Sequence, residues 1–224
     1  MKNILIFGSK GSIGAYLFEK FSKEFNVIGT TSNIDKTEKN IIYVTNEYLE
    51  NLKLYEDFDI VIWANGSNFN DNIYNFDLIN FNNIISSNTS FILNTLNYLL
   101  KYNKIKDNAK MAIISSIWQE STKQNKLCYS ISKSALNGLV KNIAIDLGEK
   151  NILVNNILPG VIDNEMSKQT LSKEQFDYIK NYTGFKRLIS LEDVYNTVKF
   201  LTNENTGITG QSIKIDLGYT NLFK

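Results

Sequence analysis

Short runs of apolar residues alternate along the chain with longer stretches in which apolar residues recur every three or four positions. The short runs predict buried strands, and the periodic stretches predict helices with an apolar face. The predicted strands are Asn3–Phe7, Asn26–Thr30, Ile41–Val44, Asp59–Trp63, Met111–Ser115, Ile152–Leu158 and Ser212–Ile215. The predicted helices are Ser12–Glu24, Asn82–Tyr102, Tyr129–Leu147 and Leu191–Thr202.

Continuous apolar strands separated by helices indicate βαβ units, which build a parallel sheet with helices on both faces. We therefore predict an α/β fold with a Rossmann-like, doubly wound parallel sheet, for which the apolar runs above supply seven strands. No internal repeat, low-complexity linker or domain boundary interrupts the pattern, so residues 1–224 are expected to form a single domain.

Segment 163–186 departs from this alternation of strands and helices. It is polar, follows Pro159, the single proline of the chain, and has helical periodicity over part of its length. In a doubly wound sheet, ligands bind at the carboxyl ends of the strands, and this segment is expected to lie at that edge. We predict that it forms a lid over the substrate.

The composition argues against several classes of function. Of the 224 residues, 43% are hydrophobic, and the formal net charge is +1 with lysines scattered among acids. Nucleic-acid binding needs a basic excess, so it is not expected. With one cysteine and no histidine, neither an internal disulfide nor a metal site is expected. No apolar run is as long as a membrane span or a signal peptide requires, which predicts a cytoplasmic protein without a membrane partner.

Tyr129 and Lys133 are the first candidate for proton chemistry. Because the chain has no histidine, another group must exchange protons near neutral pH. Residues four apart share one face of a helix, so Lys133 is expected to lie beside Tyr129. A nearby positive charge favours the phenolate, and we expect Lys133 to lower the pKa of Tyr129.

A glycine-rich turn, Gly8-Ser-Lys-Gly-Ser-Ile-Gly14, joins the first predicted strand to the first predicted helix. Glycines at such a junction permit a tight turn, and they let backbone N–H groups reach a pyrophosphate at the helix N-terminus. The turn therefore predicts a dinucleotide cofactor.

These motifs together resemble the short-chain dehydrogenase/reductase family, and the resemblance runs from Ile4 to Gly218. The turn departs from the family's Thr-Gly-x-x-x-Gly-x-Gly pattern, because Phe7 replaces the threonine and Ser12 the middle glycine. Gly11 lies one position early, although the spacing from Gly8 to Gly14 is kept. Further stretches that resemble family motifs are Ala64-Asn65-Gly66, Pro159-Gly160, Thr209-Gly210-Gln211 and Asp216-Leu217-Gly218.

The resemblance implies a catalytic set of Asn88, Ser116, Tyr129 and Lys133. Tyr129 would give a proton to the carbonyl oxygen, Lys133 would hold the nicotinamide ribose, and Ser116 would bind the substrate oxygen. Asn88 would interrupt the long helix and hold a water for proton relay. Ser115 competes with Ser116, but the spacing to Tyr129 favours Ser116. Asn88 has several asparagine neighbours that compete for its place.

The implied activity is hydride transfer between a nicotinamide cofactor and a carbonyl or alcohol substrate. No carboxylate stands at the end of the second strand, and Lys10 can reach a 2′-phosphate, so NADP(H) is expected, with NAD(H) as the alternative. The expected cofactor contacts are Gly8, Ser9, Lys10, Ser12, Ile13, Gly14, Thr31, Ser32, Ala64, Asn65, Gly66, Tyr129, Lys133, Pro159, Gly160 and Ile162.

Two alternatives stay open. The substrate is either a 3-oxoacyl thioester, which a carrier protein can present, or a sugar derivative. The chain can also be a cofactor-binding regulatory protein without turnover, which the altered glycine turn favours and the complete catalytic set opposes. By resemblance we also expect a homo-oligomer, a dimer or a tetramer.

Overall fold

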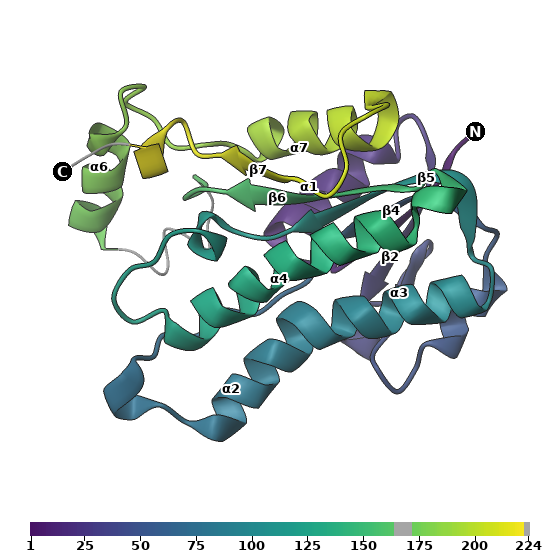
Figure 1. Cartoon of the computed structure of the whole chain (residues 1–224), viewed down its shortest axis with the longest axis horizontal. Coiled ribbons are helices and arrows are strands. Elements are labelled where there is room, and N and C mark those ends of the chain that lie inside the picture. The colour runs from purple at the N-terminus through teal and green to yellow at the C-terminus, as the bar shows by residue number, and fades with distance from the viewer. Residues whose placement is uncertain (164–171, 222–224) are drawn as a thin grey trace.

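The protein is built around one parallel sheet of seven strands (Figure 1). The computed structural model describes residues 1–163 and 172–221. The sheet has the order β3-β2-β1-β4-β5-β6-β7, and every neighbouring pair is parallel. The strands are β1 (Asn3–Phe7), β2 (Asn26–Thr31), β3 (Ile41–Tyr43), β4 (Phe58–Trp63), β5 (Ile105–Ile114), β6 (Leu153–Pro159) and β7 (Ser212–Ile215). The predicted α/β, Rossmann-like fold is confirmed.

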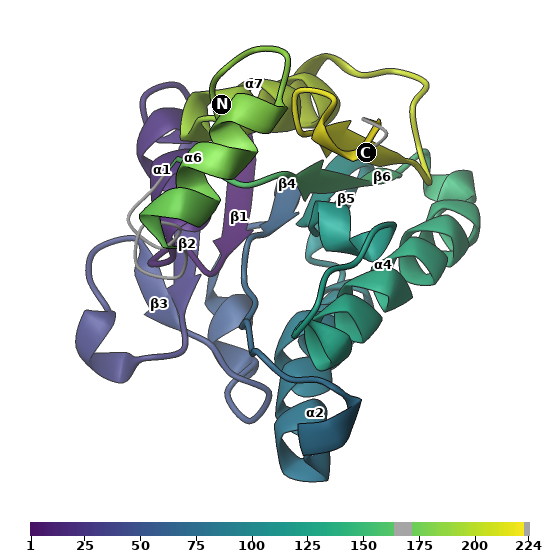
Figure 2. The ribbon, with the colours of Figure 1, turned by 90° about the vertical axis from the view of Figure 1, so that its left-hand side faces the viewer.

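Helices cover both faces of the sheet, as Figure 1 shows. One face carries α1 (Ser12–Phe21) and α7 (Leu191–Lys199), and the other carries α2 (Leu78–Ile85), α3 (Phe91–Lys101) and α4 (Leu127–Asp146). A further helix, α6 (Lys173–Tyr182), stands away from both layers in front of the sheet in Figure 2. Within the described ranges, no helix combines the length and the apolar character that a bilayer crossing demands.

The core has two halves, one on each face of the sheet, because successive strand residues point to opposite faces. Leu5 and Phe7 of β1 belong to the half beneath α3 and α4, whereas Ile4 and Ile6 belong to the half beneath α1 and α7. All four side chains are 0% exposed. Burial on both faces explains why the strands read as continuous apolar runs in the sequence.

The two largest differences from the predicted element boundaries have physical reasons. β5 begins at Ile105 rather than Met111, because its first half is polar and exposed and pairs with β4 through an irregular register. The long helix expected over residues 82–102 begins earlier, at Leu78, where the Asp77 carboxylate accepts the Asn80 N–H at 2.8 Å. It is also divided, because residues Ser86–Ser90 form a π-helical turn between α2 and α3.

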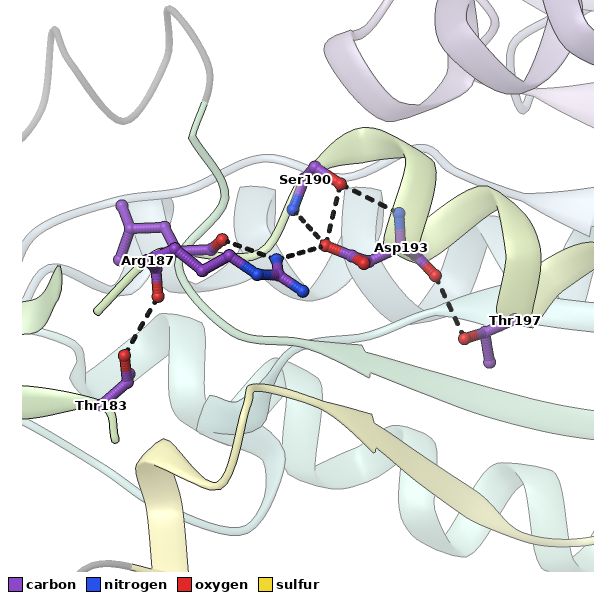
Figure 3. A network of polar contacts seen from close by, with 6 residues as sticks. Thr183, Arg187, Ser190, Asp193 and Thr197 are labelled. Atoms are coloured by element: carbon purple, nitrogen blue, oxygen red, sulfur yellow. Dashed lines mark hydrogen bonds and ion pairs between the residues drawn. The ribbon is translucent and has the colours of Figure 1, made fainter. Parts of the chain in front are cut away.

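The two ends of the expected lid, segment 163–186, are fixed near one another at the start of α7. The Asp163 N–H donates to the Ile189 carbonyl at 2.9 Å. Beyond α6, the Arg187 guanidinium bonds the Asp193 carboxylate at 2.9 Å, and that carboxylate also accepts the Ser190 N–H at 2.8 Å (Figure 3). The remaining part of the expected lid, 164–171, lies outside the described residues.

Candidate active site

The glycine turn packs directly against the end of β4. A side chain at Gly8 would stand 2.7 Å from the Asn65 nitrogen, and one at Gly14 would stand 2.1 Å from the Gly8 carbonyl oxygen. Gly8 also has a φ of +76°, in the left-handed region that favours glycine. Both glycines are therefore required by sterics, whereas Gly11 has room, since a side chain there would lie 3.4 Å from its nearest neighbour.

Three of the expected cofactor contacts are engaged elsewhere. The N–H and the hydroxyl of Ser9 both donate to the Thr30 carbonyl, each at 3.0 Å. Ser9 therefore binds the backbone of β2 and lines neither cavity. The Lys10 ammonium forms an ion pair with Glu38. The Thr31 hydroxyl bonds the backbone of Asn33. The sequence does not reveal these contacts, because Glu38 is distant from Lys10 along the chain and the partners of Ser9 and Thr31 are backbone atoms.

Two adjoining cavities lie along the carboxyl ends of the strands, and they share Asn65, Gly66 and Ser67. The first, of about 380 Å³, is lined by Gly8, Thr30, Ser32, Val44, Thr45, Asn46, Glu47, Asn83, Ser86, Ser87 and Phe91 besides the shared residues. The second, of about 560 Å³, also reaches Gly11, Ser12, Ile13, Ala64, Asn68, Ile114, Ser115, Ser116, Trp118, Lys123, Lys126, Tyr129, Lys133, Pro159, Gly160, Val161 and Ile162. Most of the expected cofactor contacts thus meet in one continuous cleft.

Tyr129 lines the second cavity from the first turn of α4, opposite Ser116 at the end of β5. Burial raises the pKa of the Tyr129 phenol, and a hydrogen bond with Ser116 opposes that rise. The Ser115 hydroxyl instead donates to the Gln119 side chain at 2.8 Å. Both serines line the cavity with Tyr129, and Ser116 is the one that influences the Tyr129 pKa.

Lys133 lies one turn further along α4 and is 4% exposed. Its ammonium donates to the Ile114 carbonyl at 3.1 Å and stands 5.8 Å from the centre of the Tyr129 ring. Burial lowers the pKa of Lys133 to about 8. The expected lowering of the Tyr129 pKa by Lys133 is not found, because burial of the phenol dominates and the opposing influence comes from Ser116.

Asn88 is 0% exposed and lies in the π-helical turn, behind the cleft. Its Oδ1 accepts the Ser67 N–H at 2.7 Å and the Ser87 hydroxyl at 3.2 Å. Its Nδ2 donates to the Ser67 carbonyl at 3.0 Å and to the Ser132 hydroxyl at 2.9 Å. The side-chain amide is thus fully engaged by protein groups and fixes the position of Ser67. The expected water for proton relay at Asn88 stays a prediction.

The cavity also contains residues that the sequence analysis did not single out. They are Ser67, Asn68, Trp118, Lys123, Lys126 and Val161. Lys126 could have been identified from the sequence, because it lies three residues before Tyr129 and therefore on the same side of the start of the helix. The others come from loops and from the short 3₁₀ helix Ile117–Gln119, and their positions depend on the tertiary structure.

Comparison with known proteins identifies the family. Residues 37–220 match the family model described as Enoyl-(Acyl carrier protein) reductase. The curated 3-oxoacyl-(acyl-carrier-protein) reductase FabG of Buchnera aphidicola subsp. Acyrthosiphon pisum is 25% identical over 232 residues, which cover 95% of this chain and 95% of that protein. L-rhamnose 1-dehydrogenase (NADP(+)) of Thermoplasma acidophilum is 38% identical over 118 residues, which cover 52% of this chain and 46% of that protein.

The same fold occurs in a solved structure of a short chain dehydrogenase family protein from Francisella tularensis. It superposes with a TM-score of 0.88 and 22% identity, covering 99% of this chain and 100% of that one. The match of the family model over most of the chain, together with this shared fold, decides the assignment. The chain belongs to the short-chain dehydrogenase/reductase family.

Proposed function

We propose that this chain is an NAD(P)-dependent oxidoreductase that interconverts a carbonyl compound and an alcohol. The observation that carries the proposal is that Tyr129, Ser116 and Lys133 line one cavity, which adjoins the glycine turn. A buried phenol stays protonated at neutral pH and can act as a general acid. Short-chain dehydrogenase/reductase membership supports the same chemistry.

The cleft fits a dinucleotide, because Gly8, Gly11, Ser12 and Ile13 of the glycine turn and the start of α1 line it. Gly11 is the N-cap of α1 and lends no side-chain hydrogen bond, so the helix N-terminus is open to an anion. The diphosphate would lie against Gly11–Ile13, with Ala64–Gly66 and Pro159–Ile162 beside the rest of the cofactor. When bound, the nicotinamide supplies or accepts the hydride.

In reduction, the carbonyl carbon gains a hydride while the Tyr129 hydroxyl gives its proton to the carbonyl oxygen. Loss of this proton leaves Tyr129 as a phenolate. The Ser116 hydroxyl donates a hydrogen bond to the same oxygen as negative charge develops on it. Lys133, whose ammonium stands 5.8 Å from the centre of the Tyr129 ring, would hold the nicotinamide ribose. The phenolate then regains a proton from solvent. In oxidation, the phenolate of Tyr129 takes the proton of the alcohol.

We propose NADP(H) as the preferred cofactor, with NAD(H) as the alternative. The Thr30 and Ser32 residues line the cavity beside β2, where they present hydroxyl groups rather than carboxylates. Lys10 is held by Glu38 in a pair whose side chains are 31% and 58% exposed, and such exposed pairs are weak. Lys10 is therefore available to a 2′-phosphate. The name of the rhamnose dehydrogenase relative includes NADP(+).

For the substrate, the 3-oxoacyl thioester and the sugar derivative remain the two proposals, and each has a relative named for that chemistry. If the substrate is the 3-oxoacyl thioester, we propose that a carrier protein presents it. We propose segment 163–186 as the lid over either substrate, because α6 stands in front of the sheet rather than in a helical layer (Figure 2). Its tyrosines Tyr178 and Tyr182 stack with centroids 5.6 Å apart.

We also propose that the chain forms a homo-oligomer, a dimer or a tetramer, in the cytoplasm. Apolar side chains on α2, α3 and α4 are exposed on the same side of the sheet, which is the kind of surface that a second copy covers. They are Leu78, Ile79, Leu93, Ile131 and Ile145. Light scattering at micromolar concentration tests the assembly, and a monomer would contradict it.

The activity is tested by following NADPH oxidation against 3-oxoacyl thioesters and keto sugars, with Tyr129→Phe as the matched variant. We expect turnover of at least one carbonyl class, reduced by about a hundredfold or more in the variant. Equal turnover in wild type and variant would refute the role of Tyr129. Cofactor binding without turnover of any substrate would favour the regulatory alternative.

A further inference from the structure

Two lysines stand in the catalytic cavity beside the groups that the proposed reaction uses. Lys123 and Lys126 belong to the connection between β5 and α4, and both line the cavity that contains Ser116 and Tyr129. The Lys126 ammonium is 5.5 Å from the centre of the Tyr129 ring. The Lys123 ammonium is 5.6 Å from the Trp118 ring, which lines the same cavity. Neither lysine has a part in the hydride or proton transfer described above.

Lys126 is buried, with 7% of its surface exposed, yet its partners are neutral. The ammonium donates to the side-chain oxygens of Asn68 and Asn70, each at 2.6 Å. The charge of Asp71 favours the charged form of Lys126, but it forms no ion pair with the ammonium. Its Oδ1 accepts the Cys128 N–H at 3.1 Å, and its Oδ2 is buried without a hydrogen-bond partner in the part of the chain that the structure describes. Among the described residues, no ion pair joins Lys126 to any carboxylate.

The charge of Lys126 is therefore only partly compensated within the protein. Burial and repulsion by Lys123 lower the pKa of Lys126 to about 8, and the more distant Asp71 opposes this only in part. Lys123 is exposed, and partial desolvation lowers its pKa. Buried charges in proteins are normally paired or bound to a ligand of opposite charge, because an unpaired one is costly to desolvate. An anion placed between the two ammonium groups would supply the missing partner and remove their mutual repulsion.

We infer that the substrate carries a compact anionic group, a carboxylate or a phosphate, that Lys126 and Lys123 hold next to the carbonyl protonated by Tyr129. The position of the carbonyl rests on the proposed function, whereas the anion site rests on the two lysines alone. Of the two proposed substrates, a charge-assisted contact at a fixed distance from the phenol would favour an acidic or phosphorylated sugar derivative over a 3-oxoacyl thioester. The same contact would align the carbonyl with Tyr129.

A purely structural role for Lys126 makes a different prediction. Its bonds to Asn68 and Asn70 tie the loop after β4 to the start of α4, and that function involves no ligand. If this were the whole role, loss of Lys126 would lower stability and weaken charged and neutral ligands alike. If the inference holds, loss of Lys126 removes the preference for the charged ligand over a neutral ligand of the same shape.

The test measures binding by calorimetry, with the chain saturated with NADP⁺. The probes are short 2-, 3- and 4-oxo acids with their methyl esters, and dihydroxyacetone phosphate with dihydroxyacetone. We expect at least one anion to bind about tenfold or more tightly than its neutral partner. A preference for an oxo acid over its ester indicates a carboxylate site, and a preference for dihydroxyacetone phosphate over dihydroxyacetone indicates a phosphate site. If no anion binds more tightly than its neutral counterpart, the inference is wrong.

The variants separate the anion site from general effects of charge and folding. Lys126→Met should abolish the preference, and Lys126→Arg should retain it. Lys123→Glu, at an exposed position where folding is not at risk, should reverse or abolish it. Lys110→Met is the control, since Lys110 bonds the Asn203 carbonyl at 3.0 Å and does not line the cavity. An unchanged preference in Lys123→Glu would overturn the inference even if Lys126→Met fails to fold.

A parallel assay of NADPH oxidation keeps this inference distinct from the proposed function. Preferential anion binding without any turnover would refute the oxidoreductase proposal and leave the anion site standing. Turnover with the same KM for each acid and its ester would refute the anion site and leave the oxidoreductase proposal standing.

Discussion

The side chain of Asn88 and the backbone of Ser67 are joined by two hydrogen bonds of opposite direction. The Ser67 N–H donates to Oδ1 at 2.7 Å, and Nδ2 donates to the Ser67 carbonyl at 3.0 Å. Ser67 lines both cavities, so this contact fixes the position of their shared wall. It also connects the loop after β4 to the π-helical turn between α2 and α3.

Asn88→Ala should therefore loosen that shared wall and destabilise the fold. Two backbone groups of Ser67 would lose their partners, and the free energy of unfolding should fall by about 1–3 kcal/mol. Urea unfolding measures this change. Asn97→Ala, at an exposed position of α3, is the control and should stay within about 0.5 kcal/mol of wild type. Equal stability of the two variants would show that the contact is unimportant.

Ser116→Ala should raise the pKa of Tyr129, because the hydrogen bond from Ser116 is the influence that lowers it. Reduction requires the protonated phenol, so activity should be lost as pH rises through the Tyr129 pKa. The alkaline limb of the kcat/KM profile should consequently move to higher pH, with kcat lowered by about a hundredfold.

Ser115→Ala is the matched control for that experiment, because its hydroxyl is bonded to Gln119. It should leave the alkaline limb in place. The phenolate absorbance of each protein, taken as a difference from Tyr129→Phe, reports the same pKa independently of turnover. A limb that moves to lower pH in Ser116→Ala would contradict the assigned direction.

Lys133→Met should stabilise the protein near neutral pH. Burial lowers the pKa of Lys133 from 10.5 to about 8, so below pH 8 the folded state holds a buried charge. Between pH 8 and pH 10.5, Lys133 is protonated in the unfolded chain but not in the folded one. The free energy of unfolding of the wild type therefore rises with pH in this window. The advantage of the variant should be about 3 kcal/mol at most near pH 7 and should shrink as pH rises through this window.

Urea unfolding at pH 7 and pH 9.5 measures that difference. Lys141→Met, at an exposed position of the same helix, should show no such dependence on pH. An advantage of Lys133→Met that stays constant across the window would mean that the lysine is not desolvated in the folded protein.

Gly14→Ala should disrupt the cofactor turn far more than Gly11→Ala. The new methyl group at Gly14 would stand 2.1 Å from the Gly8 carbonyl oxygen, whereas at Gly11 the nearest atom is 3.4 Å away. Relieving the first clash requires backbone movement and should cost about 1–3 kcal/mol of stability. Thermal unfolding and cofactor quenching of tryptophan fluorescence measure the two effects, and similar behaviour of both variants would contradict the packing described here.

Glu38→Gln should strengthen NADPH binding without strengthening NADH binding. Removal of the carboxylate frees the Lys10 ammonium from its ion pair, and the 2′-phosphate distinguishes the two cofactors. Because the pair is exposed, the expected gain is about two- to fivefold. Fluorescence titration with both cofactors measures it. A loss of NADPH affinity would show that Lys10 and Glu38 act as a unit at the phosphate.

Much of the fold was predictable because the sheet is buried on both faces. Leu5 and Phe7 face one half of the core and Ile4 and Ile6 the other, so β1 leaves a continuous apolar run in the sequence. The first half of β5 left no such signal, because it is polar and exposed. The interruption around Asn88 was expected from the family resemblance, but the earlier start of that helix at Leu78 was not.

The chemical groups and their order could be identified without a structure: the glycine turn, Ser116, Tyr129 and Lys133, in a chain without histidine. Helical periodicity also placed Tyr129 and Lys133 on one face, since that is a local property of the backbone. Tertiary structure alone decided the partners of Ser9, Lys10 and Asn88, and which influence dominates the Tyr129 pKa. It also placed Lys123 and Lys126 in the cavity. Burial and contacts between distant segments arise only when the chain is packed, so the sequence could not reveal them.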